Sequence, residues 1–458
     1  MAGLTERHRS ALATLVCAIA IFLATADQAF GTRLLGINLR VANVILGLAL
    51  VAWLVRHRGP RNEVSSLLVA WTPFIIVFAL AALLSPHPAL GAVKLGWFAF
   101  NFFAAYAFVC LFRPTESTRG FFAAFVAVSA IVAIDFLIGF TRGPSAMIGF
   151  GQPNDLVPGT ILYRPHAFYY EPSYAASGIA LAWALALTRM AVVAPALATV
   201  LVGLGLVALA ATLSRTGWLY AVVTAIALLI LSRRAAIDAL REHRKRVIAA
   251  LAIIVAVAIT MLAPEANRAR ASALLRTLGV SQTFERICPI VRDTFSASLA
   301  CLSDEARKRV MTRPSDIVPE QTGEGQRITQ LRESVARIAA NPLLGHGVTP
   351  GRTRLIEPVT SNVWLEIATE GGLLSATAFA FGLVMTMIRW RAFEGPNRSI
   401  AVALILYFVV AWPFLQTFPR LDTWVALWIA LAFAARQPFA SSQTASASTG
   451  APSSNTRA

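Results

Sequence analysis

The chain has 458 residues, of which 57% are hydrophobic and only 14% are charged. Soluble domains carry about 25% charged residues, so this composition excludes an ordinary soluble protein and indicates lipid as the main solvent. The net charge of +17 could suggest nucleic acid, but the basic residues cluster at the ends of apolar runs, so we expect no nucleic acid partner.

Apolar runs long enough to cross a membrane fill most of the chain. A span needs about 20 predominantly apolar residues. The sequence predicts twelve, at 11–30, 34–55, 64–84, 91–112, 120–139, 172–190, 193–213, 216–232, 247–263, 362–388, 399–416 and 420–435. Ala24-Thr25-Ala26 is similar to a signal-peptidase site. We nevertheless expect an uncleaved first span, because further spans follow at once.

The short loops that we place inside carry most of the loop arginines, which predicts cytoplasmic N- and C-termini. The predicted organisation is 1–263 with nine spans and a short outer loop at 140–171, a large outer loop at 264–361, three spans within 362–436, and a disordered cytoplasmic tail at 437–458.

The large outer loop has two notable features. Between Gly325 and Ala340, the apolar residues Ile328, Leu331, Val335 and Ile338 form one helical stripe, and Asn341-Pro342 stops the helix. This helix could lie over the membrane or cap a cavity, or it could belong to a small outer domain. Cys288 and Cys301 are candidates for a disulfide in an oxidising compartment, with two separate buried thiols as the alternative.

Four charged residues interrupt predicted spans near their outer ends: Asp27, Arg40, Lys94 and Asp135. Charges beside lipid are costly. Their shared depth therefore predicts an outward-facing wet cavity, although any one of them could instead reach to the headgroups.

Two further clusters lie at the outer boundary. The segment from Arg164 to Tyr174 combines an arginine, His166, Glu171 and aromatic rings, where a loop meets a span. Arg215 lies between two spans that are joined by almost no loop. An arginine held there could present paired donors to a phosphate, or it could anchor a headgroup.

The order of four motifs resembles the O-antigen ligase and polysaccharide polymerase superfamily of bacterial membrane glycosyltransferases. The motifs are Arg164…Phe168…Glu171-Pro172-Ser173-Tyr174-Ala175, Leu213-Ser214-Arg215-Thr216-Gly217, Arg327 leading to Asn341-Pro342-Leu343-Leu344-Gly345-His346-Gly347, and Ser361-Asn362-Val363-Trp364-Leu365-Glu366…Glu370-Gly371-Gly372-Leu373. The similarity covers mainly residues 160–390.

This resemblance implies an all-α, polytopic fold of the C-type glycosyltransferase kind, with one large outer loop, in the bacterial inner membrane. The implied donor is a glycan on undecaprenyl diphosphate. Ligases transfer it to the lipid A core, and polymerases join repeat units. Many ligases have a histidine where this chain has Ser361, and Glu171-Pro172-Ser173 is similar to polymerases, so we expect a polymerase with a ligase as the alternative.

The expected catalytic groups are Glu171 as the base, or as the residue that orients Arg164, and Arg164 and Arg215 as diphosphate ligands. Further substrate-binding candidates are Arg327, His166, His346, Tyr170 and Asn362, with either histidine as an alternative base. The aromatic residues Phe168, Tyr169, Tyr170 and Tyr174 could stack on sugars, but we expect an interfacial belt.

The motifs suggest a reaction without metal or cofactor, although Asp27 and Asp135 leave a metal open. The expected partners are the lipid-linked donor, a glycan or lipid A core acceptor, membrane lipids and a chain-length regulator. A transporter is the main rival, but we detect no two matching halves.

Overall fold

The computed structural model describes residues 5–25, 31–34, 37–56, 62–142, 144–154, 162–169, 171–231, 323–348, 362–389, 397–414 and 421–435. These residues are mostly helical. The α-helices are α1 (Glu6–Thr25), α2 (Val41–Arg56), α3 (Asn62–Leu83), α4 (Pro88–Leu111), α5 (Pro114–Thr141), α6 (Pro172–Ala186), α7 (Pro195–Thr212), α8 (Arg215–Leu231), α14 (Gly323–Ala340), α15 (Val363–Arg389), α16 (Arg398–Leu406) and α17 (Leu421–Ala435).

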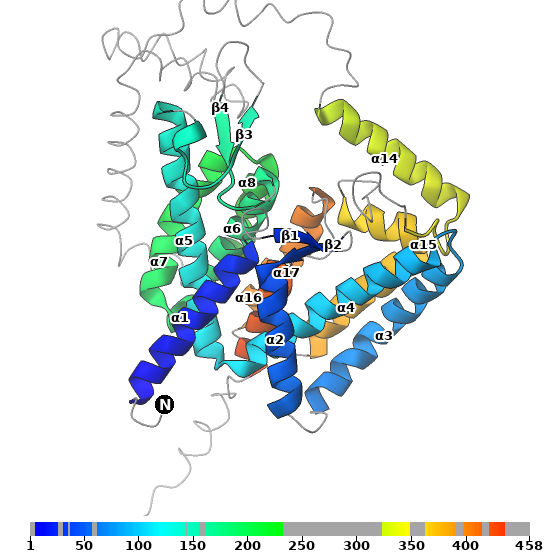
Figure 1. Ribbon diagram of the computed structural model, residues 1–458, viewed down its shortest axis with the longest axis horizontal. Coiled ribbons are helices and arrows are strands. Elements are labelled where there is room, and N and C mark those ends of the chain that lie inside the picture. Colours follow the sequence, from blue (N-terminus) through cyan, green and yellow to red (C-terminus); the bar gives the residue numbers. More distant parts are fainter. Residues whose placement is uncertain are drawn as a thin grey trace, which may run out of the picture.

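Short elements connect these helices. Strands β1 (Gly31–Leu34) and β2 (Ile37–Arg40) form one antiparallel hairpin, and β3 (Gly151–Asn154) and β4 (Leu162–Pro165) form a second. Short helical turns are η1 (Pro144–Ala146), η2 (Arg189–Val193), η5 (Tyr407–Ala411) and η6 (Trp412–Phe414). We call the end of the bundle at which β3, β4 and α14 lie the loop end (Figure 1).

The helices agree with an all-α membrane protein. Within the described ranges, five helices are long and apolar enough to cross a membrane: Glu6–Thr25, Pro88–Leu111, Pro114–Gly139, Pro195–Thr212 and Val363–Ile388. Shorter apolar helices lie at Asn43–Val55, Val69–Leu83, Thr216–Leu231 and Arg398–Ala411. Leucine, isoleucine and valine side chains on their outward faces are exposed, as expected where lipid is the solvent.

Helix positions follow the apolar runs closely, with two differences. The second predicted span begins late, at Val41, because residues 31–34 and 37–40 pair as a hairpin. The predicted span 172–190 ends as an α-helix at Ala186, and a 3-10 turn follows. The predicted span 247–263 lies outside the described residues, so the count of twelve crossings stays a prediction.

Two kinds of packing build the core. Trp71 of α3 meets Phe98 of α4, Phe379 of α15 and Trp424 of α17, with ring centroids 5.1–5.7 Å apart for these and neighbouring pairs. Aromatic pairs at such distances favour edge-to-face packing. By contrast, α6 is alanine-rich, and all its residues except Ser173 are buried. Its small side chains let α5, α7 and α8 approach closely.

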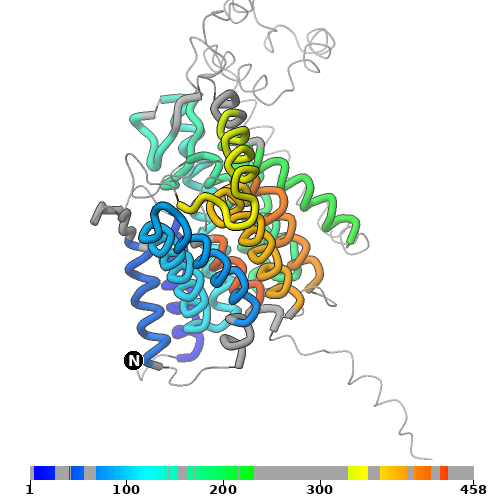
Figure 2. Tube along the Cα trace, turned by 90° about the vertical axis from the view of Figure 1, so that its right-hand side faces the viewer, coloured from blue at the N-terminus to red at the C-terminus, as the bar shows by residue number. Residues whose placement is uncertain are grey.

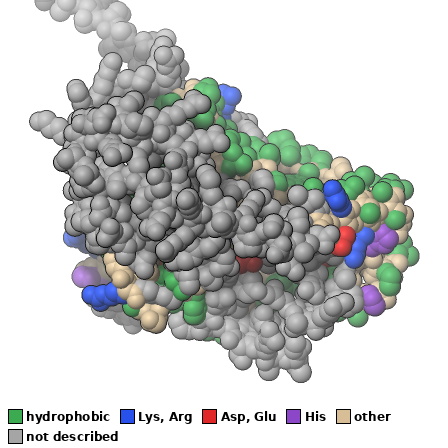
Figure 3. All heavy atoms as spheres, turned by 90° about the horizontal axis from the view of Figure 1, so that it is seen from above, with side chains coloured by type: hydrophobic (Ala, Val, Ile, Leu, Met, Phe, Trp, Pro, Cys, Tyr) green, Lys and Arg blue, Asp and Glu red, His purple; other side chains and the backbone are tan. Residues whose placement is uncertain are grey.

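The helix α14 lies outside the bundle, and its C-terminal end meets α15 (Figures 1 and 2). Among its described side chains Ser334 is buried, whereas Leu331 and Val335 of the predicted apolar stripe are 47% and 51% exposed. The predicted helix is therefore present, but these two apolar residues do not pack on the bundle. A role over the membrane and a role in an outer domain both stay predictions. Seen from above, the described side chains that are visible are mainly hydrophobic, with a few charged groups among them (Figure 3).

Candidate functional site

A buried carboxylate fixes the start of the β3–β4 region. Asp135 of α5 is fully buried, and its two carboxylate oxygens accept hydrogen bonds from the backbone N–H groups of Ile148 at 2.6 Å and Gly149 at 2.9 Å. Both acceptors are therefore used inside the protein. This corrects the prediction of a wet cavity at Asp135, because the residue instead holds the 144–154 segment on the bundle.

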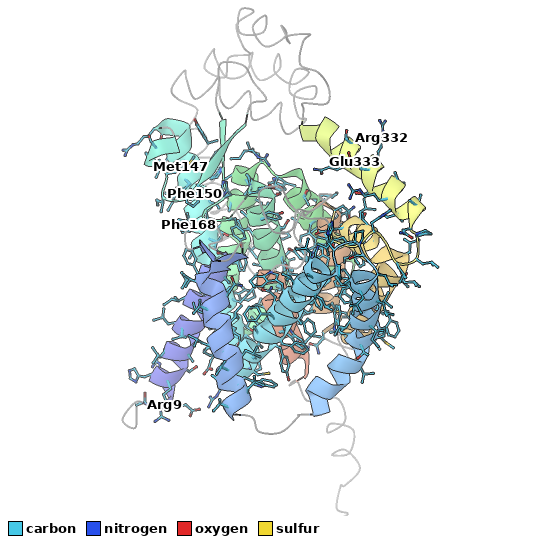
Figure 4. The ribbon with its side chains drawn as sticks, turned by 45° about the vertical axis from the view of Figure 1, so that its right-hand side comes forward. Arg9, Met147, Phe150, Phe168, Arg332 and Glu333 are labelled. Carbon is cyan, nitrogen blue, oxygen red and sulfur yellow. The ribbon has the colours of Figure 1, made fainter. Side chains whose placement is uncertain are left out.

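The 144–154 segment also forms backbone hydrogen bonds with the residues that follow β4. Phe150 N donates to Ala167 O at 2.7 Å, and His166 N donates to Phe150 O at 2.9 Å. A Cβ atom on Gly149 would lie 2.6 Å from the Ala167 carbonyl oxygen, so only glycine allows this approach. Met147, Phe150 and Phe168 lie together at this end, far from Arg9 at the other end (Figure 4).

His166 is one of the residues held by these hydrogen bonds. It is 2% exposed, and its Nδ1 lies 2.6 Å from the carbonyl oxygen of Tyr169, so Nδ1 carries the proton. Burial, helped by the nearby Arg164 cation, lowers the pKa of His166 to about 4. The imidazole is therefore neutral near pH 7 and holds the loop, whereas its predicted contact with substrate stays a prediction.

Arg164 connects β4 with the end of α7. Its Nε donates to the carbonyl oxygen of Thr212 at 3.2 Å. Thr212 is the last residue of α7, and the chain then turns through Leu213, whose φ of 52° is left-handed, directly into α8 at Arg215. The fold therefore brings the Arg164 guanidinium to the turn that carries Arg215.

The first turns of α6 and α8 lie side by side at this place. A Cβ atom on Gly217 would lie 2.8 Å from the Cβ of Ala176, so the two backbones are in close contact. Helix N-termini present free N–H groups and a positive dipole end. Glu171 stands at the N-cap position of α6, where its Oε2 accepts a hydrogen bond from Ser173 Oγ at 3.2 Å.

A second part of the loop end is built around a break in α15. Gly372 has φ 73° and ψ 176°, and the helix bends there. The loop 341–347 inserts at the bend. His346 N and Gly347 N donate to Thr369 O and Glu370 O at 2.8 and 2.9 Å, and Leu373 N donates to Pro342 O at 2.8 Å. The loop thus satisfies backbone groups that the bend leaves open.

Two predicted binding residues frame this broken helix. Asn362 caps its start, because Oδ1 accepts from Leu365 N at 3.1 Å. His346 is half-buried, and its Nε2 has no hydrogen-bond partner among the described residues. Arg327 lies on α14, near its N-terminal end.

Sequence reasoning missed one cluster of charges. Lys94 of α4 contacts two carboxylates of α15: its Nζ lies 2.5 Å from Glu366 Oε1 and 2.6 Å from Glu370 Oε2. All three residues are more than nine-tenths buried. Lys94 therefore does not line a wet cavity as predicted. The available signal was a pair of glutamates at i and i+4 in one apolar run and a lone lysine in another.

Other predictions have mixed outcomes. Tyr169 and Tyr174 are 0% and 2% exposed, so the predicted aromatic belt is wrong for them: they belong to the core. Tyr170, Asp27, Cys288 and Cys301 lie outside the described residues, and for Arg40 the structure describes only its place in β2. Within the described ranges, no group of three metal-binding side chains occurs.

The fold and this site define a polytopic α-helical membrane protein with a polar, arginine-bearing loop end. Residues 198–380 match the family model described as O-antigen ligase. The match confirms, over these residues, the resemblance to the O-antigen ligase and polymerase family that the motifs predicted; the members of that family are membrane enzymes of the ligase or polymerase type. No curated protein matched the chain.

Proposed function

We propose that this protein polymerises polysaccharide repeat units, taking the glycan from undecaprenyl diphosphate at the periplasmic face of the bacterial inner membrane. The observation that supports this most is the bond of Arg164 Nε to Thr212 O. It brings one candidate phosphate ligand to the turn that carries the other, Arg215. A lipid-linked diphosphate is the donor that such an arrangement suits.

In this reaction a sugar hydroxyl attacks the anomeric carbon, and the bond to the diphosphate breaks. Negative charge grows on the departing oxygen, and preorganised cations and N–H dipoles stabilise it. Arg164, Arg215 and the first N–H groups of α8 are suited to this role. Arg327 on α14 is a third candidate.

The attacking hydroxyl also needs a proton acceptor. Glu171 is our candidate, since it is the N-cap of α6, whose Ala176 touches Gly217 of α8, and it is only half-buried. The alternative is that Glu171 orients Arg164. His166 is less suited as a base because its pKa is about 4. His346, with its unpartnered Nε2 among the described residues, is the second candidate for the base, and Asn362 and Tyr170 are candidates for sugar contacts.

The choice of a polymerase rests on sequence. Glu171-Pro172-Ser173 is similar to polymerases, and Ser361 stands where many ligases have histidine. The family description favours the alternative, transfer to the lipid A core. The expected partners are the lipid-linked donor, the acceptor glycan and a chain-length regulator.

A reconstituted assay separates these functions. Purified protein in lipid vesicles is supplied with a repeat unit on undecaprenyl diphosphate, with or without lipid A core. A ladder of lengthening glycans without lipid A core supports a polymerase. Transfer that occurs only with lipid A core would make the protein a ligase, and no product in either mixture would overturn both.

Two substitutions test the assigned roles. Glu171→Gln removes the base and should lower turnover by about 10²–10⁴-fold. Arg215→Lys keeps the charge but loses the paired donors, so donor affinity and rate should both fall. Arg113→Lys, at an exposed ion pair with Glu6 on another part of the chain, is the matched control and should leave turnover unchanged. Wild-type turnover in Glu171→Gln would remove it as the base.

A further inference from the structure

The first half of α15 is attached to the bundle by charges. We call the segment Val363–Gly371 the half-helix; it runs from the Asn362 cap to the bend at Gly372. Glu366 and Glu370 lie one turn apart on the same face of it. Both meet Lys94 Nζ, at 2.5 and 2.6 Å.

The buried ion cluster of Lys94, Glu366 and Glu370 is not explained by stability alone. Replacing buried ion pairs by apolar residues often leaves stability unchanged or raises it, so such a cluster is weak support for a purely stabilising role. In addition, Glu366 Oε2 and Glu370 Oε1 are buried without a partner among the described residues. A directional contact of this kind fixes a position, whereas apolar packing in the same place would allow sliding.

The half-helix needs such fixing because the bend separates it from the rest of α15. The backbone ladder is interrupted at Gly372, where loop 341–347 supplies partners instead. Besides the Lys94 cluster and this loop, a further hydrogen bond holds the half-helix: Trp364 Nε1 donates to Phe408 O at 2.9 Å.

That last bond links the half-helix to the start of α8. Phe408 belongs to η5, which packs on α8. Tyr220, in the second turn of α8, donates its hydroxyl to Ala403 O at 2.8 Å, and its ring meets that of Tyr407 at 5.4 Å. The half-helix and the helix that begins at Arg215 therefore rest on the same segment, residues 403–408.

We propose that Lys94 is a positioning residue for the glycosyl transfer proposed above, on which this inference rests: by holding Glu366 and Glu370 it sets the half-helix, and with it Asn362, relative to the start of α8. Lys94 itself does not meet the substrate. Displacing a positioned element by about 1 Å can cost up to about 100-fold in rate.

Three variants separate positioning from charge neutralisation. Lys94→Met leaves two buried carboxylates without their cation. Lys94→Met with Glu366→Gln and Glu370→Gln removes every charge and so keeps folding testable. Lys94→Glu with Glu370→Lys exchanges one pair of charges but keeps one lysine and two carboxylates. Arg113→Met, at the exposed pair with Glu6, is the control.

Two measurements are made on each protein in vesicles. Hydrogen–deuterium exchange compares residues 363–371 with residues 373–389, and kinetics give kcat and the KM for the lipid-linked donor separately. We expect the neutral triple variant to fold, to exchange faster only in 363–371, and to lose about 10- to 100-fold in kcat with an unchanged donor KM. The charge-exchanged variant should recover part of the kcat, and the control should match wild type.

Other results would overturn the inference. Wild-type kcat in the triple variant would do so, whether or not its exchange rises. Failure of all three variants to fold would also do so, because the cluster would then be a requirement for folding. Exchange is independent of turnover: if the wild-type protein transfers no glycan, the proposed function fails, while the exchange data still decide whether Lys94 holds the half-helix.

Discussion

Replacing Gly372 with alanine would place a methyl group against the backbone of loop 341–347. The added Cβ would overlap the carbonyl group of Leu343, and φ 73° with ψ 176° is a conformation that residues with a side chain rarely adopt. Adopting such a conformation costs about 1–3 kcal/mol. Relieving the overlap would also separate Leu373 N from Pro342 O and Leu374 N from Leu343 O, now at 2.8 and 3.4 Å.

Each of these hydrogen bonds contributes about 1 kcal/mol net. Together with the backbone strain, the expected destabilisation of Gly372→Ala is about 3–5 kcal/mol. The thermal midpoint, followed by tryptophan fluorescence of the purified protein in lipid nanodiscs, measures it. Gly203→Ala is the matched control, because a Cβ there meets nothing within 4 Å and alanine favours the helix. Equal midpoints for the two variants would refute the account of the bend.

Three further outcomes follow, two at the loop end and one at the opposite end of the bundle. In Asp135→Asn, one of the backbone N–H groups of Ile148 and Gly149 must face an amide NH₂ instead of a carboxylate oxygen. We therefore expect the free energy of unfolding to fall by about 1–3 kcal/mol and hydrogen exchange in residues 144–154 to become faster. Unchanged exchange would contradict the role of this carboxylate. Burial lowers the pKa of His166 from 6.5 to about 4, so between these pH values the folded state binds fewer protons than the unfolded state. The free energy of unfolding is therefore highest above pH 6.5 and falls by up to about 3 kcal/mol as the pH is lowered to 4. His166→Asn retains a donor for Tyr169 O but does not titrate, so a midpoint with the same pH dependence as wild type would disprove this assignment. Glu6→Gln breaks the ion pair with Arg113, in which both side chains are more than half exposed, and should leave the midpoint unchanged.

The helical segments could be predicted closely from the sequence. Apolar runs such as 91–112 and 399–416 correspond to α4 and to α16 with its following turns, because the thickness of the lipid sets the length of an apolar run. The hairpin β1–β2 was missed, since its residues, among them Leu34, Ile37 and Leu39, are partly apolar and gave no separate signal.

The site was only partly predictable. Arg164 and Arg215 were expected to converge, and the bond of Arg164 to Thr212 brings the two segments together. The charges in the spans were interpreted wrongly. Asp135 binds the 144–154 segment and Lys94 binds α15, so both are internal contacts and not the lining of a cavity.

The sequence by itself determined that this is a helical membrane protein, where its helices lie and which family its motifs resemble, because these properties depend on local composition and short motifs. Tertiary structure decided which charges meet. Lys94 and Glu366 are 272 residues apart, and a buried ion depends on the one partner that folding brings within reach. Tertiary structure also decided the bend at Gly372. A glycine in an apolar run becomes a break in the helix only when loop 341–347 supplies the missing hydrogen bonds.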